Sequence, residues 1–188
     1  VRVEGAEHFE KAAGPNLIVS NHTSLLDGVM LYLFLPKPPL FLVSQTTAQL
    51  WYFKPFLYPI KKLLIDDLHP MTLKKAIKEL SLGQTIVVFP EGRITTTGVL
   101  MKIYDGPAML AAKSRANVMP VGIEGLQHSY FSYLKGLLHL KLLPSVKITI
   151  LPTEVIKPHT QLPPKMRRKK RSQAMFKIMQ KISFRNTY

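Results

Sequence analysis

Short apolar runs, separated by segments with helical spacing, are the feature that most limits how this chain can fold. The runs are rich in aliphatic residues and bounded by Gly, Pro or polar residues, which is typical of buried strands. They lie at residues 17–19, 40–44, 85–89, 118–125 and 146–151. Strands that alternate with helices favour a mostly parallel sheet. The sequence therefore predicts an α/β fold, with a mixed, mostly parallel sheet flanked by helices.

The segments around these runs have their own expected structure. Two further stretches look strand-like, and the sequence from residue 11 to residue 16 looks like a turn. Pro120 predicts an edge position or a bulge for its strand, because proline lacks the N–H that a sheet ladder uses. The expected extra strands are residues 1–5 and 63–67, and the expected helices begin at Gly28, cover 71–82 and 101–117, and begin again at Met166.

The length of 188 residues suits one domain with a real core, so residues 1–188 are predicted to form a single domain. The chain begins at Val1 rather than methionine, and we expect it to be a fragment of a longer protein. It has no cysteine, and its six histidines are not spaced as metal ligands. The sequence therefore predicts neither a metal site nor a cofactor.

Positive charge dominates the composition, with 26 Lys and Arg against 11 Asp and Glu, a net charge of +15. Such a chain seeks polyanions: nucleic acid, an anionic membrane surface or an acidic protein. No apolar run approaches the roughly 20 residues that a membrane-spanning helix needs. We therefore expect a chain that can lie on a membrane without crossing it.

A histidine and an aspartate follow the first buried strand. His22 stands at the carboxyl end of that strand, where open α/β sheets place their ligands, and Asp27 stands at the start of the next helix. If Thr23 or Ser24 caps the helix, the two side chains can meet at its N-terminus, where the helix dipole favours a carboxylate. His22 could then act as a general base that Asp27 orients, with a substrate hydroxyl as the nucleophile. Ser24-x-x-Asp27 is also a capping-box pattern, so a purely structural role stays open.

A second polar turn follows the strand at residues 85–89. Pro90 ends the strand, and Glu91, Gly92 and Arg93 follow it. An arginine offers a planar fork of donors that matches phosphate oxygens, and the nearby threonines, Thr95 among them, add hydroxyl and amide donors. This turn is a candidate phosphate-binding site, although Pro and Gly alone also explain it as the end of a strand.

Two other segments fit a membrane surface. Residues 51–62 interleave aromatic residues with lysines, which suits the headgroup level of a bilayer, although stacking on nucleobases or packing into the core with solvent-exposed lysines would also explain them. The final helix places Met175, Ile178, Met179 and Ile182 opposite a basic face, which fits either an interfacial helix or docking on the core.

Three motifs in this order resemble the glycerolipid and lysophospholipid acyltransferase family, over essentially the whole chain. The run from Phe89 to Gly98, continued through Gly106, is most similar to the acyltransferase portion of the bacterial bifunctional 2-acylglycerophosphoethanolamine acyltransferase/acyl-acyl-carrier-protein synthetase. The motifs are Asn21-His22-x-x-x-x-Asp27, Phe89-Pro90-Glu91-Gly92 and Val118-Met119-Pro120-Val121-x-Ile123-x-Gly125.

The resemblance implies that His22 is the general base for a lysophospholipid hydroxyl, oriented by Asp27, and that the acyl group comes from a thioester. It also implies a substrate site around Asn21, Glu91, Gly92, Arg93 and Thr95, with an acyl carrier protein as donor and the cytoplasmic face of the bacterial inner membrane as the location of a peripheral protein. No nucleic acid is expected as a partner.

Two positions depart from the family pattern. Arg93 stands one position earlier than the arginine of many relatives, and Asp67 stands where a phosphate-binding arginine is usual. The second change favours lysophosphatidylethanolamine as acceptor over lysophosphatidic acid, which is the alternative within the family. From other classes, a nucleic-acid-binding module and a non-catalytic membrane-binding domain remain as alternatives.

Overall fold

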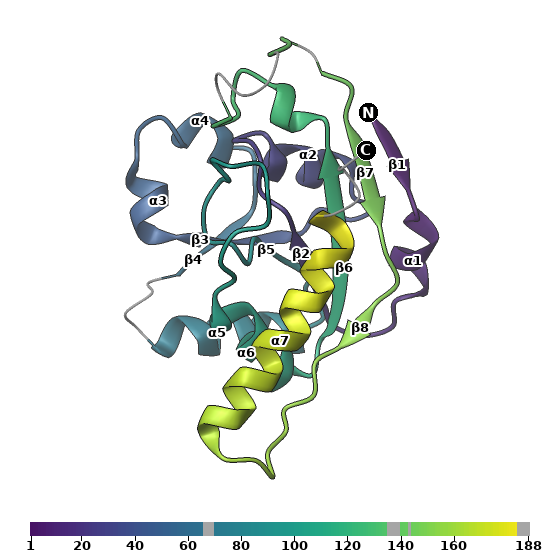
Figure 1. The fold of residues 1–188 in the computed structure, drawn as a ribbon, viewed down its shortest axis with the longest axis vertical. Helices are drawn as coiled ribbons and strands as arrows, with labels where there is room; N and C mark the ends of the chain where they lie inside the picture. Colours follow the sequence, from purple (N-terminus) through teal and green to yellow (C-terminus); the bar gives the residue numbers. More distant parts are fainter. Residues whose placement is uncertain (66–69, 135–139, 143, 184–188) are drawn as a thin grey trace.

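The computed structural model describes residues 1–65, 70–134, 140–142 and 144–183. Within them, one sheet has the strand order β1-β7-β6-β2-β5-β3-β4, and β8 pairs with β6 (Figure 1). The strands are β1 (Arg2–Glu4), β2 (Asn16–Ser20), β3 (Leu40–Ser44), β4 (Lys62–Ile65), β5 (Ile86–Val88), β6 (Asn117–Glu124), β7 (Lys147–Ile150) and β8 (Glu154–Val155). The helices are α1 (Ala6–Lys11), α2 (Asp27–Phe34), α3 (Gln45–Gln49), α4 (Lys54–Leu57), α5 (Pro70–Ser81), α6 (Asp105–Ser114) and α7 (Pro164–Ser183), with a 3₁₀ turn at Leu126–His128.

The sheet is mixed and mostly parallel, as the sequence predicted. Its central strand β2 pairs in parallel with β5 and β6, and β3 pairs in parallel with β4 and β5. Strand β1 is parallel to β7, whereas β6 is antiparallel to β7 and β8. The parallel arrangement brings the carboxyl ends of β2 and β5 to the same edge, which places the two polar turns side by side.

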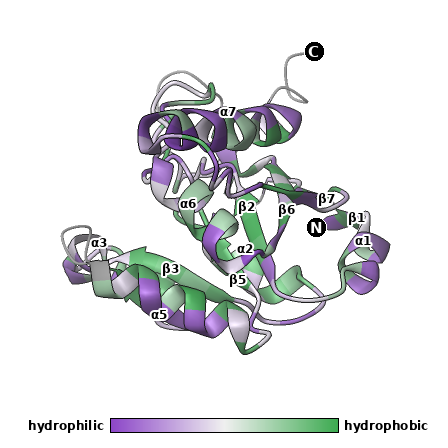
Figure 2. Ribbon diagram, turned by 90° about the horizontal axis from the view of Figure 1, so that it is seen from below, coloured by the Kyte–Doolittle hydropathy of each residue, from purple (hydrophilic) through white to green (hydrophobic). Residues whose placement is uncertain are grey.

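Helices cover both faces of the sheet, so the central strands are buried on both faces. Leu17 and Val19 of β2 pack with α5, α6 and α7, whereas Ile18 faces a second core that includes Phe9 of α1 and Leu31 of α2. Figure 2 shows hydrophobic strands inside and hydrophilic residues on the outer surfaces of α5 and α7. This two-sided burial explains why these strands read as continuous apolar runs.

The structure decides between the two interpretations of the final helix, an interfacial membrane helix and docking on the core. Met175, Ile178, Met179 and Ile182 are all at most 3% exposed and belong to the core that also contains α5 and α6. The apolar face of α7 therefore docks on the domain, and its basic face points away from the core. The interfacial-helix interpretation is wrong for this apolar face.

The structure has elements that the sequence analysis did not predict, among them α3, α4 and β8, and it shortens one that was predicted. Residues 6–11 form α1, which the sequence analysis did not expect, and the helix expected at 101–117 covers only Asp105–Ser114. Its predicted first turn is extended because the N–H of Met101 donates to the Glu91 carboxylate and the N–H of Tyr104 donates to the carbonyl of Pro90. These bonds hold residues 101–104 against the turn that follows β5.

The edge position predicted for Pro120 is wrong, whereas the bulge is confirmed, because three steps along β6 from Val121 to Val118 oppose four steps from Ile150 to Glu154. Pro120 lies within β6, between neighbours on both sides, and pairs with Val19 of β2. Its carbonyl accepts from the N–H of Leu151 at 2.9 Å, so its ring nitrogen faces the same side. The β7 ladder ends there at Val121 and Ile150, and β8 resumes at Glu154. The N–H that proline lacks would therefore face the gap between β7 and β8, where the ladder has no hydrogen bond to lose.

Candidate active site

His22 and Asp27 meet at the N-terminus of α2, as their spacing predicted. The His22 Nδ1 atom lies 2.8 Å from the Asp27 Oδ2 atom. Because an ionised carboxylate only accepts hydrogen bonds, this contact puts the proton of a neutral imidazole on Nδ1. The Nε2 lone pair is then available for a substrate.

Backbone donors hold the carboxylate of Asp27 in place. Its side chain is fully buried, and Oδ2 accepts the N–H of Thr23 at 2.6 Å and the N–H of Ser24 at 2.9 Å. The cap itself differs from the prediction, because Leu26 is the N-cap and Asp27 is the first helical residue. Asp27 therefore reaches back as a capping-box acid would and also contacts His22. The structural and the catalytic interpretations of this motif are compatible.

The His22 ring is fixed on its face as well as at its Nδ1 edge. It stacks on the Phe89 ring, with centroids 4.0 Å apart and planes 15° apart, and its side chain is 15% exposed. Among the described residues, no hydrogen bond is formed by its Nε2 atom. A histidine with one fixed tautomer, a fixed ring plane and an open second nitrogen can accept a proton at that nitrogen.

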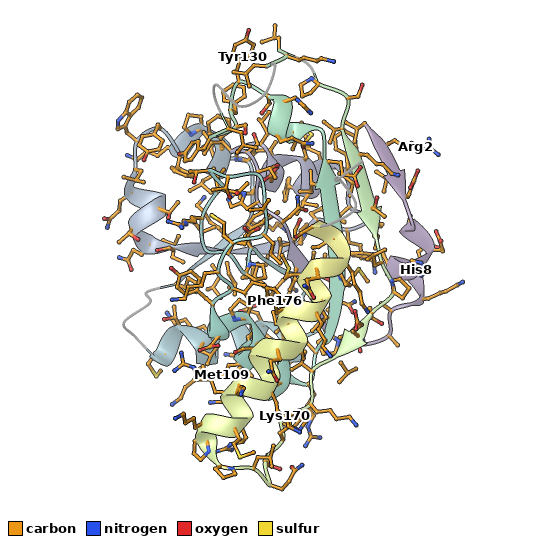
Figure 3. The ribbon with its side chains drawn as sticks, in the orientation of Figure 1. Arg2, His8, Met109, Tyr130, Lys170 and Phe176 are labelled. Atoms are coloured by element: carbon orange, nitrogen blue, oxygen red, sulfur yellow. The ribbon has the colours of Figure 1, made fainter. Side chains whose placement is uncertain are left out.

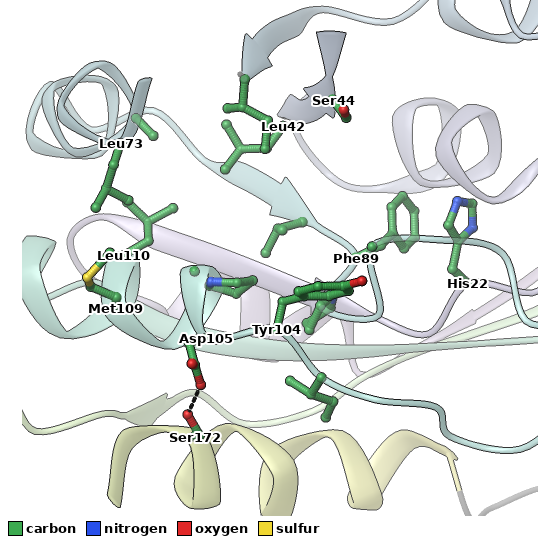
Figure 4. A pocket seen from close by; sticks show the side chains of 18 of the residues that line it. His22, Leu42, Ser44, Leu73, Phe89, Tyr104, Asp105, Met109, Leu110 and Ser172 are labelled. Carbon is green, nitrogen blue, oxygen red and sulfur yellow. Dashed lines mark hydrogen bonds between the residues drawn. The ribbon is translucent and has the colours of Figure 1, made fainter. Parts of the chain in front are cut away.

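A large cavity opens beside this histidine. Its volume is about 2160 Å³, and it runs from His22 and Phe89 past Tyr104 to Leu73 and Met109 (Figure 4). The residues of β3 and α5 that line it are mainly aliphatic, whereas lysines and Arg168 of α7 line its other side. Sequence reasoning did not find these lining residues, because a cavity wall and a packed core have the same apolar pattern.

The turn after β5 lies against the loop that carries His22 and Asp27. Glu91 is 3% exposed, its Oε2 atom accepts the N–H of Met101 at 3.1 Å, and its Oε1 atom accepts the N–H of His22 at 3.4 Å. Burial raises the pKa of this carboxyl, and the two backbone bonds and the nearby His22 offset part of that effect. Glu91 therefore joins the two polar turns, which lie far apart in the sequence.

The other predicted site residues occupy different positions. Gly92 lines the cavity at a φ of 66°, and an added Cβ would lie 3.0 Å from the Tyr104 ring. Arg93 is exposed and is not among the residues that line the cavity. The two turns around His22 therefore present a glycine, and not the guanidinium, to the cavity.

Thr95 and Asn21 are buried and bind the backbone of their neighbours. Thr95 donates its N–H to the carbonyl of His22 at 2.8 Å, and its Oγ1 accepts the N–H of Gly98 at 3.1 Å. The Asn21 amide donates to the carbonyl of Ile123 at 2.9 Å and accepts its N–H at 2.8 Å. Both side chains are already paired, which fits a role in holding the His22 loop against β6 and the β5 turn.

Replacing Glu91 with glutamine should change how stability depends on pH. A carboxyl with a raised pKa binds its proton more tightly in the folded state, so its contribution to stability is present below the ordinary value of 4.5 and is lost as pH rises through the folded pKa. The free energy of unfolding of the native chain relative to Glu91→Gln should therefore fall as pH rises through this range. Urea unfolding at several pH values measures this, and a difference that is constant or rises with pH contradicts it.

The structure reveals neither a metal site nor a spanning helix in the part of the chain that it describes. Within that part, no group of three or more His, Asp or Glu side chains is placed to hold a metal ion. Likewise, no described helix is long and apolar enough to cross a bilayer.

Comparison with known proteins shows the family and the fold. The fold is similar to the crystal structure of the 1-acyl-sn-glycerophosphate (LPA) acyltransferase PlsC from Thermotoga maritima, with a TM-score of 0.67 and 23% identity, covering 100% of this chain and 73% of that one. The family model described as Acyltransferase matches residues 1–124, which is more than half of the chain. This protein therefore belongs to the acyltransferase family.

Proposed function

We propose that this acyltransferase moves a fatty acyl group from a thioester to the free glycerol hydroxyl of a lysophospholipid. The observation that carries the proposal is the His22–Asp27 pair, with Nδ1 bound to a buried carboxylate and Nε2 open beside a large cavity. A nucleic-acid-binding module or a non-catalytic membrane domain would have no use for this pair.

In the proposed reaction, the Nε2 atom of His22 accepts the proton of the glycerol hydroxyl while its oxygen attacks the thioester carbonyl. A C–O bond forms, the C–S bond breaks, and the imidazolium returns its proton to the departing thiolate. Asp27 keeps the reactive tautomer and stabilises the imidazolium while it exists. The same base therefore serves both halves of the transfer, and no metal or cofactor is required in this proposal.

The cavity supports a substrate with both apolar and anionic parts. Aliphatic side chains of β3 and α5, such as Leu42 and Leu73, suit an acyl chain. Lys165, Lys169 and Lys177 of α7 line the other side and suit an anionic donor. We propose an acyl carrier protein as this donor, with coenzyme A as a possible substitute in the assay.

We further propose lysophosphatidylethanolamine as the acceptor, in phospholipid remodelling. The support is the motif similarity to the bifunctional acyltransferase/synthetase described above and the acids Asp66 and Asp67, which stand near a position where relatives carry arginine. Both acids lie outside the described residues. On this proposal, the chain is the acyltransferase domain of a longer enzyme, located peripherally at the cytoplasmic face of the bacterial inner membrane.

The solved relative favours a second candidate acceptor. Its name assigns lysophosphatidic acid to the Thermotoga maritima enzyme, and this chain shares its fold. If the same acceptor served here, a cation other than an arginine at position 67 would have to bind the terminal phosphate.

Comparing the two acceptors tests the headgroup assignment. Presented in identical mixed micelles with the same acyl thioester, lysophosphatidylethanolamine should give the larger kcat/KM. Faster turnover of lysophosphatidic acid contradicts the ethanolamine assignment and leaves the acyltransferase assignment intact. Absence of transfer to either acceptor contradicts both.

A further inference from the structure

Exposed aromatic rings gather at the sheet edge that carries His22. We call this surface the aromatic edge, formed by two segments far apart in the sequence: residues 51–58 around α4 and residues 130–133 after the 3₁₀ turn. Its most exposed members are Trp51 at 79%, Tyr58 at 89% and Tyr130 at 54%. Rings this exposed do not belong to the core, so the core-packing interpretation of the 51–62 segment is wrong for Trp51 and Tyr58.

The two segments form one surface. Phe56 and Phe131 pack edge to face with ring centroids 5.2 Å apart. Burial raises the pKa of Tyr133, and the charge of Tyr52 on the other segment raises it further. The aromatic edge is therefore continuous, although some 70 residues of sequence separate its halves.

The two aromatic segments stand in stretches of sequence without acidic residues. No aspartate or glutamate occurs in residues 28–65 or in residues 125–153. Lys54 lies within the aromatic segment and is exposed. Amphipathic rings combined with lysines and no acid match the headgroup region of an anionic bilayer.

The aromatic edge is also attached to the active site. The N–H of Leu25 donates to the carbonyl of Phe131 at 3.1 Å, and the hydroxyls of Ser24 and Ser129 lie 2.9 Å apart. Phe53 and Phe56 line the same cavity as His22. A lipid entering at this edge would thus pass aromatic side chains on its way to the base.

We propose that the aromatic edge docks on an anionic lipid bilayer, so that a lipid acceptor enters the cavity from the membrane. The part about lipid entry rests on the proposed function, whereas the docking does not. The basic helix α7 is not the docking surface on this proposal. Figure 3 shows Tyr130 at one end of the molecule and Lys170 of α7 near the other, so the two surfaces can be tested separately.

The chain carries its own probe for this test, because Trp51 is its one tryptophan. Vesicles containing phosphatidylglycerol should shift the Trp51 emission to the blue, and lipids with a nitroxide near the headgroup should quench it. Pure phosphatidylcholine vesicles should give a smaller effect, since they lack the anionic charge. His22→Ala should respond as the native chain does, which separates docking from catalysis.

Two lysine variants with the same change in net charge locate the contact. Lys54→Ala should weaken sedimentation with the anionic vesicles roughly fivefold, the effect of one lysine near the bilayer surface, whereas Lys170→Ala should change it little. Several results would overturn the proposal: no vesicle binding, binding with unchanged Trp51 emission, or the reverse order of the two variants. A blue shift that depends on protein concentration without lipid would instead indicate docking between two copies of the chain.

Discussion

Replacing His22 with alanine is expected to lower acyl transfer by roughly 10²–10⁴-fold, the usual contribution of a positioned general base. The variant should remain folded, because the Asp27 carboxylate keeps its bonds from the N–H groups of Thr23 and Ser24. The loss should appear in kcat and not in KM, since the proton moves only during the chemical step. Steady-state rates at saturating acceptor, together with circular dichroism, measure both points.

A matched control separates proton transfer by His22 from the packing of its ring on Phe89. Phe89 stacks on His22 without offering a proton acceptor, so Phe89→Leu should reduce the rate far less than His22→Ala. Equal rates for native protein and a folded His22→Ala variant would remove this histidine from the chemistry.

Substitutions of Asp27 should affect both activity and stability, and two variants divide these effects. Asp27→Ala leaves two buried N–H donors without an acceptor, which should lower the free energy of unfolding by at least about 1–3 kcal/mol. Asp27→Asn keeps an amide oxygen for those donors, so its loss of stability should be smaller. Urea unfolding of both variants measures this order, and equal stability of both would contradict the hydrogen-bond account of the loop.

Asp27→Asn should also lose activity, although less than His22→Ala does. The same Oδ2 position accepts both N–H groups and contacts Nδ1, so an asparagine oxygen that keeps these donors also keeps the proton of His22 on Nδ1. What is lost is the negative charge that stabilises the imidazolium, and we expect a rate loss of roughly tenfold at saturating substrate, because a hydrogen bond to a charged acceptor is worth about 1 kcal/mol more than a neutral one. Retained activity in a folded Asp27→Asn variant would mean that the carboxylate serves the loop alone.

The sequence predicted the parts of this molecule that depend on local pattern. The strands that deliver His22 and Glu91 are buried on both faces, so each is a continuous apolar run that is visible without the structure. The spacing of His22 and Asp27 also sufficed, because a helix N-terminus after a strand brings residues five positions apart together.

What the sequence did not reveal depends on contacts between distant segments. The start of α6 moved to Asp105 because Glu91 and Pro90 hold residues 101–104 by hydrogen bonds. For Pro120 the local rule left an edge position and a bulge open, and only the register of β7 and β8 along β6 shows that the position is a bulge. Tertiary contacts of this kind override propensity.

The site residues show the same difference between what local pattern predicts and what tertiary contacts decide. Asn21 and Thr95 were predicted to bind substrate from their place in the motifs, whereas the structure pairs them with the backbone of Ile123, His22 and Gly98. A motif position indicates that a side chain matters in the site, but only its partners indicate whether it holds the loop or faces the cavity.

The central claim is a single transfer reaction, and its products test it most directly. Native protein would be incubated with a radiolabelled acyl-carrier-protein thioester and lysophosphatidylethanolamine in mixed micelles, and the lipid product and the free thiol would be measured together. The account predicts one diacyl phospholipid for each thiol released, with both products lost in His22→Ala. Thiol release without a labelled phospholipid, or equal product from both proteins, would contradict it.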